Sequence, residues 1–169
     1  MIRIEIKQWK KKMPGIFEKV RRDVEKVTGH HRAGLSLGLA ELGMYNGMFV
    51  GGMHFSPGTL IVMNKTPLEV VLQEQPEQIV HAYTYHILLH EYIHSLGVIN
   101  EQQCRDITQR ISKQVYKDDN HPARRIARKG IGTFFPDLDF IYAPPQRKPE
   151  GISIEYVSGF DRNSYSYYS

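Results

Sequence analysis

Two histidines and one glutamate are spaced in this sequence so that a helix would place them around one metal ion. His90 and His94 are four residues apart, so on a helix they share a face with their β-carbons about 5–6 Å apart. Two imidazoles at that separation can bind one tetrahedral Zn²⁺. Glu91 flanks the pair and would stand beside a metal-bound water, whose proton it could accept and pass to a leaving amine. The pattern predicts a metal-dependent hydrolase with two histidine ligands and Glu91 as the catalytic base.

Chance is the competing explanation for this spacing, because the chain has eight histidines. Random placement of the same residues would produce the pattern in roughly 2% of such chains. The context argues against chance, since the three residues lie near the end of an expected helix and Gly97 follows three residues after His94. Buried imidazoles without partners on an apolar helix would also be costly. We therefore expect the chain to bind one zinc ion.

The segment HEYIHSLG, residues 90–97, resembles the HExxH signature of the zincin metallopeptidases. It is also similar to the HExxHxxG beginning of the metzincins, in which the glycine turns the chain toward a third ligand three residues later. That position is Asn100 here, and asparagine is a poor zinc ligand. The pair Asn100-Glu101 is similar to the asparagine-glutamate pair of the gluzincins, but it follows His94 more closely than in their large members. The resemblance covers about eight to twelve residues. Within that stretch, the chain resembles a minimal, archaeal-like member of the zincins.

This resemblance implies a fold, a cofactor and a substrate. The fold would be α+β: a small zincin-like domain with a short mixed β-sheet, at about residues 33–64, packed on an active-site helix, at about residues 77–96, and on further helices. The activity would be zinc-dependent cleavage of a peptide or protein. Zincins bind extended peptide along an edge strand that precedes the active-site helix. The resemblance therefore implies that Thr59–Asn64 or Met48–Phe55 binds the substrate.

A catalytic zinc site needs a third protein ligand and keeps a fourth position open. Glu101 lies seven residues after His94, where a chain that doubles back beneath the metal would arrive. His121 is the better donor, but the helix expected before it carries the chain about 25 Å away, and four residues span at most about 14 Å. We therefore expect Glu101 to be the third ligand, with His121 as the alternative. The remaining candidates are Asp106 and His54.

Other side chains near the motif could support the site. His86 shares the helix face of the first motif histidine but lies two turns from His94, so we expect it to pack beside the site rather than to bind the metal. Tyr142 and Tyr156 could each donate a hydroxyl group to an oxyanion, and nothing in the sequence selects one of them. Cys104 is expected to be a core residue, as a single buried helical cysteine commonly is.

The elements expected around the motif are helices and short strands. Apolar spacing, proline positions and capping residues predict helices over residues 14–27, 66–75, 77–96, 100–116 and 122–129. Short apolar runs punctuated by glycine predict several strands within residues 33–64, a weak strand at residues 2–6 and another at residues 152–157.

The length of 169 residues fits one compact domain. We expect a single zincin-like catalytic domain over residues 1–143, followed by a Pro- and Tyr-rich extension over residues 144–169 whose end is mobile. The single cysteine excludes an intrachain disulfide and a cysteine-rich structural zinc site, which suits a reducing cytoplasm. The first residues lack the apolar stretch of a signal peptide, and no run of about 18 apolar residues follows. We therefore expect a cytoplasmic protein that does not bind a membrane.

Two other functions compete with the peptidase. The net charge of +4 and the pI of about 9.1 would suit RNA, and small rRNA-processing metalloproteins carry a histidine pair at the same spacing. Those proteins lack a glutamate after the first histidine and have a third histidine where Asn100 stands, so Glu91 favours the peptidase. A non-catalytic, zinc-stabilised interaction domain would instead hold a coordinatively closed metal without an exchangeable water.

Overall fold

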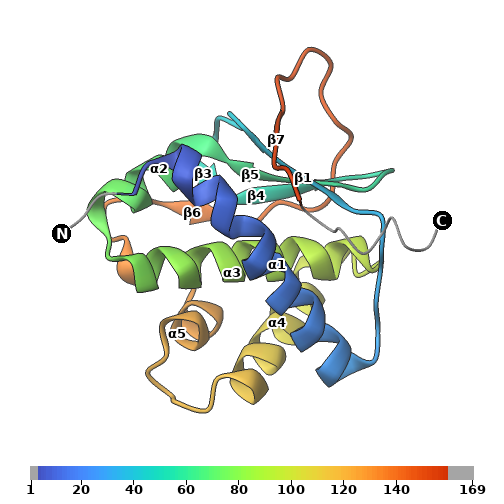
Figure 1. Cartoon of the computed structure of the whole chain (residues 1–169), viewed down its shortest axis with the longest axis vertical. Helices are drawn as coiled ribbons and strands as arrows, with labels where there is room; N and C mark the ends of the chain where they lie inside the picture. The colour runs from blue at the N-terminus through green and yellow to red at the C-terminus, as the bar shows by residue number, and fades with distance from the viewer. Residues whose placement is uncertain (1–3, 160–169) are drawn as a thin grey trace.

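A computed structural model describes residues 4–159 of the chain and shows a mixed α+β fold. The predicted α+β class is confirmed, although the described strands form two small sheets rather than one. Helix α3 (Glu77–Ser95) runs between the larger sheet on one side and helices α4 (Glu101–Val115) and α5 (Pro122–Lys129) on the other (Figure 1). The segment that carries the histidine pair is therefore enclosed from both sides.

The larger sheet has the strand order β4-β5-β1-β7. Strand β1 (Ser36–Ala40) pairs in parallel with β5 (Leu60–Asn64), and β5 pairs antiparallel with the edge strand β4 (Gly52–Phe55). On its other side β1 pairs antiparallel with β7 (Glu155–Tyr156), which is shorter than the strand predicted there. Residues of the predicted C-terminal extension thus add a strand to this sheet. The end that we expected to be mobile lies outside the described residues, from residue 160 onward.

The smaller sheet has the order β2-β3-β6, formed by β2 (Met44–Tyr45), β3 (Met48–Val50) and β6 (Phe140–Ile141). Strands β2 and β3 form a hairpin whose turn, Asn46-Gly47, has positive φ at both residues, as a tight hairpin turn favours. Strand β6 comes from a distant part of the sequence and pairs in parallel with β3. This pairing brings the chain after residue 140 back to the strands that face α3.

The first helix begins earlier than predicted. Helix α1 spans Ile6–Thr28, so the prediction of a helix that starts at Pro14 is wrong, and so is the strand predicted at residues 2–6 in its described part. Trp9 and Met13 continue the buried stripe of this helix and are fully buried. Burying two such side chains is worth about 1.5–3 kcal/mol each, which together at least matches the cost of about 3 kcal/mol for a proline inside a helix.

The other helices confirm the predicted ranges to within one residue at each end. Helix α2 (Lys65–Glu74) precedes α3, and a 3-10 turn, η1 (Ile131–Phe134), follows α5. Helix α3 is buried along most of its length, because α1, α4, α5 and the strands β4 and β5 all pack against it. No helix within residues 4–159 combines the length and the apolar character needed to cross a bilayer.

Two glycines allow the sheet to lie close against α3. A Cβ atom on Gly51 would come within 2.4 Å of Ile87 Cδ1. A Cβ atom on Gly52 would come within 2.6 Å of Ile87 Cγ2 and 3.0 Å of the Val62 carbonyl oxygen. The contacts at Gly52 are more rigid than the one at Gly51. Cγ2 is attached directly to the branched β-carbon of a helical isoleucine, and the carbonyl oxygen belongs to the backbone. The absence of a side chain at Gly52 therefore sets the distance between β4 and α3.

We expect Gly52→Ala to destabilise the protein by about 1–3 kcal/mol, because the added methyl group overpacks this contact. The matched substitution Gly15→Ala lies inside α1, and its new Cβ atom meets no heavy atom within 4 Å. It should stabilise the protein by up to about 1 kcal/mol through its higher helix propensity. Urea unfolding of both variants measures the two effects. A Gly52→Ala variant as stable as the wild-type protein would show that β4 and α3 can move apart without cost.

Candidate metal centre

Helix α3 holds the motif residues inside the protein. His90, Glu91 and His94 have exposed fractions of 1%, 3% and 2%. The centres of the two imidazole rings lie 4.8 Å apart, in keeping with the four-residue spacing on one helix face. Polar side chains buried in this way need polar partners, because a buried group left without one costs about 1–3 kcal/mol.

The carboxylate of Glu101 is a partner that both imidazoles share. His94 Nε2 lies 2.5 Å from Glu101 Oε1, and His90 Nε2 lies 3.2 Å from Glu101 Oε2. Two local features bring the carboxylate to this point. Gly97 reverses the chain after α3 with a φ of 106°, a conformation that favours glycine, and the Asn100 side chain caps α4 by accepting a backbone N–H of its first turn. Asn100 is therefore the cap that positions Glu101.

The contact with the imidazoles keeps Glu101 ionised. Burial alone would raise the pKa of Glu101, but hydrogen bonds from His90 and His94 and their charges lower it to about 2. Burial also lowers the pKa of His94, but Glu101, Glu91 and the Val98 carbonyl oxygen outweigh that effect, so the net direction is upward. Without a metal, the contacts favour an ionised Glu101 and a protonated His94, because both ring nitrogens of His94 face acceptors, and a metal ion would have to displace the proton on Nε2.

The ring nitrogen of His94 that could bind a metal is identified by the bond that the other nitrogen makes. His94 Nδ1 lies 2.6 Å from the Val98 carbonyl oxygen. Since a carbonyl oxygen only accepts, Nδ1 donates, and Nε2 is the nitrogen whose lone pair a metal would bind after displacing the proton directed at Glu101. In His90, Nδ1 has no partner among the described residues, whereas Nε2 faces Glu101. Both histidines therefore turn Nε2 toward the same carboxylate.

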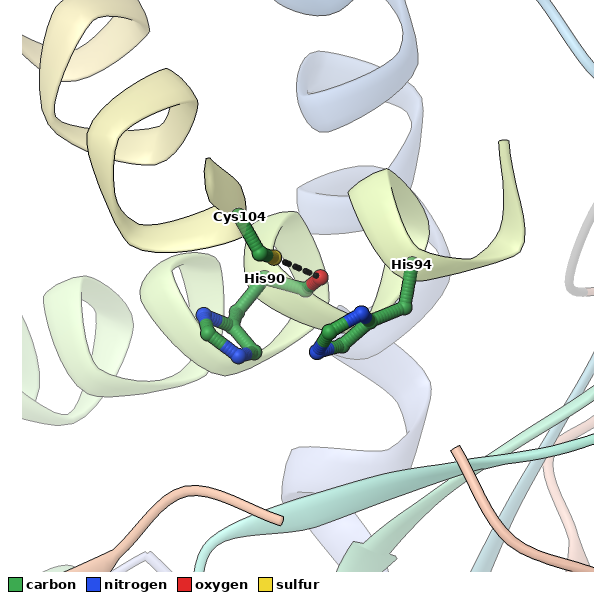
Figure 2. Close-up of side chains that lie close together, drawn as sticks. All are labelled: His90, His94 and Cys104. Carbon is green, nitrogen blue, oxygen red and sulfur yellow. Dashed lines mark hydrogen bonds between the residues drawn. The ribbon is translucent and has the colours of Figure 1, made fainter. Parts of the chain in front are cut away.

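A buried cysteine lies beside the histidine pair. One ligand atom from each of His90, His94 and Cys104 lies within 4.8 Å of the others, so this buried group could hold a metal ion. The Cys104 thiol donates to the His90 carbonyl oxygen at 3.3 Å (Figure 2). Figure 2 shows the sulfur beside the backbone of α3 and the two imidazole rings with nitrogens turned toward each other. The structure thus offers Glu101 and Cys104 as the two residues that could complete a site around the pair.

Glu91 is held by the edge strand of the larger sheet. Its Oε1 accepts the backbone N–H of His54, on β4, at 3.0 Å. Burial raises the pKa of Glu91, and the neighbouring His90 and His94 act in the opposite direction without cancelling the effect. A carboxyl group with a raised pKa is better matched to proton transfer near neutral pH than an exposed one. The position and the environment of Glu91 suit a general base.

The other predicted ligands lie elsewhere. His121 caps α5, where its Nδ1 accepts a backbone N–H at 3.1 Å, and its ring stacks on Tyr116 at 3.9 Å. Asp106 is exposed and accepts a hydrogen bond from a glutamine on α4. His54 contributes its backbone to the site, while its Nε2 lies 3.1 Å from a backbone carbonyl oxygen of the following turn. Within the described contacts, none of these three side chains meets the imidazole pair.

One tyrosine packs on the imidazole pair from a distant part of the chain. The Tyr142 ring stacks on the His90 ring at 4.3 Å, and the Tyr142 hydroxyl lies 2.6 Å from His86 Nε2. Tyr156, the other tyrosine considered, is 56% exposed on β7. No local signal in the sequence distinguishes Tyr142, because its position depends on the pairing of β6 with β3.

The outer edge of β4 is paired with a later segment of the chain at its C-terminal end. Residues 140–146, the covering segment, pair in parallel with β3 at one end and with the last residue of β4 at the other, in the same register. Backbone hydrogen bonds join Gln146 to His54 at 3.4 Å and to Ser56 at 2.8 Å. Strand β5 lies between β4 and β1, so the prediction that Thr59–Asn64 binds substrate at a free edge is wrong. The other predicted segment, Met48–Phe55, includes the edge strand β4, and the end of that edge is already paired with Gln146.

The contact between Glu101 and His94 predicts how stability changes with pH in the metal-free protein. The lowered pKa of Glu101 contributes stability that is present above its ordinary value of 4.5 and is lost as the pH falls toward about 2. The raised pKa of His94 contributes stability that is present below its ordinary value of 6.5 and is lost as the pH rises through the folded-state pKa. Glu101→Gln should therefore lower the free energy of unfolding most between pH 4.5 and pH 6.5, by on the order of 2 kcal/mol, and by less at lower or higher pH.

Unfolding of both proteins in the presence of a chelator, from about pH 3 to about pH 8, measures this difference. A difference that does not change with pH would show that the contact is not ionic.

Three elements contribute to the candidate site: α3 supplies the imidazoles and Glu91, α4 supplies Glu101, and β4 supplies a backbone N–H. Comparison of the chain with models of protein families, with curated proteins and with solved structures found no match. The interpretation of the site therefore depends on the geometry and chemistry of these residues.

Proposed function

We propose that the protein is a zinc-dependent hydrolase that cleaves peptide bonds. One observation carries this proposal: Glu101 meets the Nε2 atoms of both His90 and His94, at 3.2 and 2.5 Å, beside the helix that also holds Glu91. Two histidines and one glutamate are a ligand set of catalytic zinc sites, which keep their fourth position open. Imidazole nitrogen and carboxylate oxygen are suitable donors for Zn²⁺ at such a site.

Glu91 is the residue that moves protons in this reaction. When bound, zinc supplies a Lewis acid that lowers the pKa of water and polarises a carbonyl group. The Glu91 carboxylate accepts a proton from the attacking water as the water oxygen bonds to the carbonyl carbon of the substrate. Glu91 then donates that proton to the leaving nitrogen as the C–N bond breaks. The His54 N–H orients Oε1 of the carboxylate during both transfers.

Two observations favour Glu101 over Cys104 as the third ligand. The Glu101 oxygens face the Nε2 atoms of the imidazole pair, whereas the Cys104 thiol is engaged by the His90 carbonyl oxygen. The two side chains also differ in ionisation. The pKa of Glu101 is lowered to about 2, whereas burial raises the pKa of Cys104, so near neutral pH only Glu101 is in the ionised form that binds metal.

One observation favours a second function. Cys104 lies close enough to join His90 and His94 around a metal ion, and Glu101 faces the same pair. Four protein ligands would close the site and leave no position for water, as in structural zinc sites. The chain would then be a zinc-stabilised interaction domain. The two functions differ in whether zinc binding requires Cys104.

The proposal is tested by the cleavage of a random peptide library. The zinc-loaded protein should cleave peptides, a chelator should stop the reaction, and added zinc should restore it. The Glu91→Gln variant should be inactive in the same assay. Tight zinc binding without cleavage of any peptide in the library would contradict the peptidase and favour the interaction domain.

A further inference from the structure

A cavity of about 510 Å³ adjoins the candidate metal centre on the side of α4. Glu101 and Tyr142, which both contact the imidazole pair, form part of its wall. The rest of the wall comes from the end of α5, from η1 and the turn that follows it, and from β6. Polar and apolar groups share this surface, and the apolar part includes Ile131, Phe135, Leu138, Phe140 and Ile141. A molecule bound here would touch residues that surround the histidine pair.

The cavity offers a substrate an approach that β4 does not. The covering segment, residues 140–146, pairs with the C-terminal end of β4, so a peptide could add there only by displacing it. The cavity instead reaches Glu101 with the covering segment in place. Access from the side of α4 is therefore compatible with the hydrogen bonds that the protein already makes.

Arg105 places a positive charge at this cavity. It follows Glu101 by one helical turn, which is about 6 Å along α4. Its guanidinium carbon lies 5.3 Å from the centre of the Tyr142 ring, and that ring stacks at 4.3 Å on His90. The guanidinium group therefore lies within about 10 Å of the His90 ring, which is roughly the span of three extended residues.

The two cations on the cavity wall make no salt bridge among the described residues. Arg105 makes a cation–π contact with Tyr142 but no salt bridge to any residue within 4–159, and Lys129 on the same wall likewise has no acidic partner in that range. The acids on the wall are Asp139 and Glu101, and Glu101 is engaged by the two imidazoles. The wall thus carries two cations and two carboxylates, but Glu101 is directed at the imidazoles, so one of the two cations is left without an acidic counterpart on the wall.

We propose that Arg105 binds a carboxylate group of the peptide substrate, while the apolar part of the wall takes a neighbouring hydrophobic side chain. This inference rests on the proposed peptidase function and specifies its substrate class. A guanidinium group binds a carboxylate through two charge-assisted hydrogen bonds, and the stacking of Arg105 on Tyr142 orients it for this role. The carboxylate belongs either to the C-terminus of a short peptide or to an Asp or Glu side chain, within about three residues of the cleaved bond.

Two matched pairs of peptides distinguish these sources. Acetyl-Gly-Phe-Leu, as the free acid or as the amide, tests a terminal carboxylate, and acetyl-Gly-Phe-Glu-Leu-amide against its glutamine counterpart tests a side chain. We expect Arg105→Gln to lower kcat/KM for the acidic member of one pair by about 10- to 100-fold and to leave the neutral member unchanged. Arg110→Gln, an exposed arginine of the same helix outside the cavity wall, is the control and should change neither.

Binding of the same peptides to the zinc-loaded Glu91→Gln protein, measured by calorimetry, separates this inference from the proposed function. Tighter binding of the acidic member that depends on Arg105 supports the carboxylate site, even if the wild-type protein cleaves no peptide and the peptidase proposal fails. Conversely, cleavage by the wild-type protein with equal preference for acidic and neutral members, unchanged in Arg105→Gln, overturns the carboxylate site and leaves the peptidase standing. Equal binding of the two members in both pairs also overturns it.

Discussion

Replacement of Glu91 by glutamine should abolish peptide cleavage and leave the fold and the bound zinc intact. Glutamine keeps the volume of the side chain, and its amide oxygen can still accept the His54 N–H. It cannot take up the proton that the attacking water must lose. A general base contributes about 10²- to 10⁴-fold to a reaction rate, so kcat should fall by at least about 100-fold. Single-turnover cleavage of a peptide selected from the library measures the change.

The matched control for this variant is Glu77→Gln. Glu77 lies in the first turn of the same helix, but its side chain is 54% exposed and pairs with Lys12 at the surface. The control should cleave peptide at the wild-type rate, and elemental analysis should find about one zinc per chain in both variants. Wild-type cleavage by Glu91→Gln would exclude Glu91 as the base. Loss of zinc from that variant would instead assign Glu91 a structural role.

Zinc affinity should depend on Glu101 much more than on Cys104. Zinc sites with four protein ligands bind with about 10–16 kcal/mol, so one ligand contributes on the order of 3 kcal/mol, or about 100-fold in affinity. We expect His94→Gln and Glu101→Ala each to weaken zinc binding by at least this factor. Cys104→Ser keeps a donor for the His90 carbonyl oxygen, and His121→Gln changes a residue at the start of α5, so both should bind zinc as the wild-type protein does.

Competition with a chromogenic chelator at one pH measures the four affinities, and circular dichroism of the metal-free variants shows whether each one folds. Loss of zinc from both Cys104→Ser and Glu101→Ala would establish the closed, non-catalytic site with four protein ligands, whereas loss from Cys104→Ser alone would make Cys104 the third ligand in place of Glu101. Loss of zinc from His121→Gln would show that the chain after α4 reaches the metal, contrary to its position as the cap of α5.

The imidazole pair could be predicted from the sequence because its geometry is local. The spacing of His90 and His94 places them on one face of any helix, and Gly97 indicates where that helix ends. The proximity of Glu101 follows from the same kind of reasoning, since a short turn separates α3 from α4 and Asn100 has the side chain of a helix cap. Each of these features involves residues that are close together in the chain.

Helix α1 shows where such local signals fail. Pro14 is well suited to the first turn of a helix, so the sequence predicts a helix that begins there. In the folded protein Trp9 and Met13 lie in the core, and their burial extends the helix across the proline. The boundary of this element was therefore decided by tertiary packing, which is worth more than the local preference.

The surroundings of the imidazole pair depend on tertiary structure. Tyr142, the covering segment and the cavity beside Arg105 all follow from the parallel pairing of β6 with β3. These two strands have two and three residues, too few for a periodic pattern to indicate a partner or a register. Local spacing thus defines which side chains can meet at a metal, because a helix has one geometry. Contacts between distant segments decide what can reach that metal, because access depends on which surfaces the whole chain has already buried.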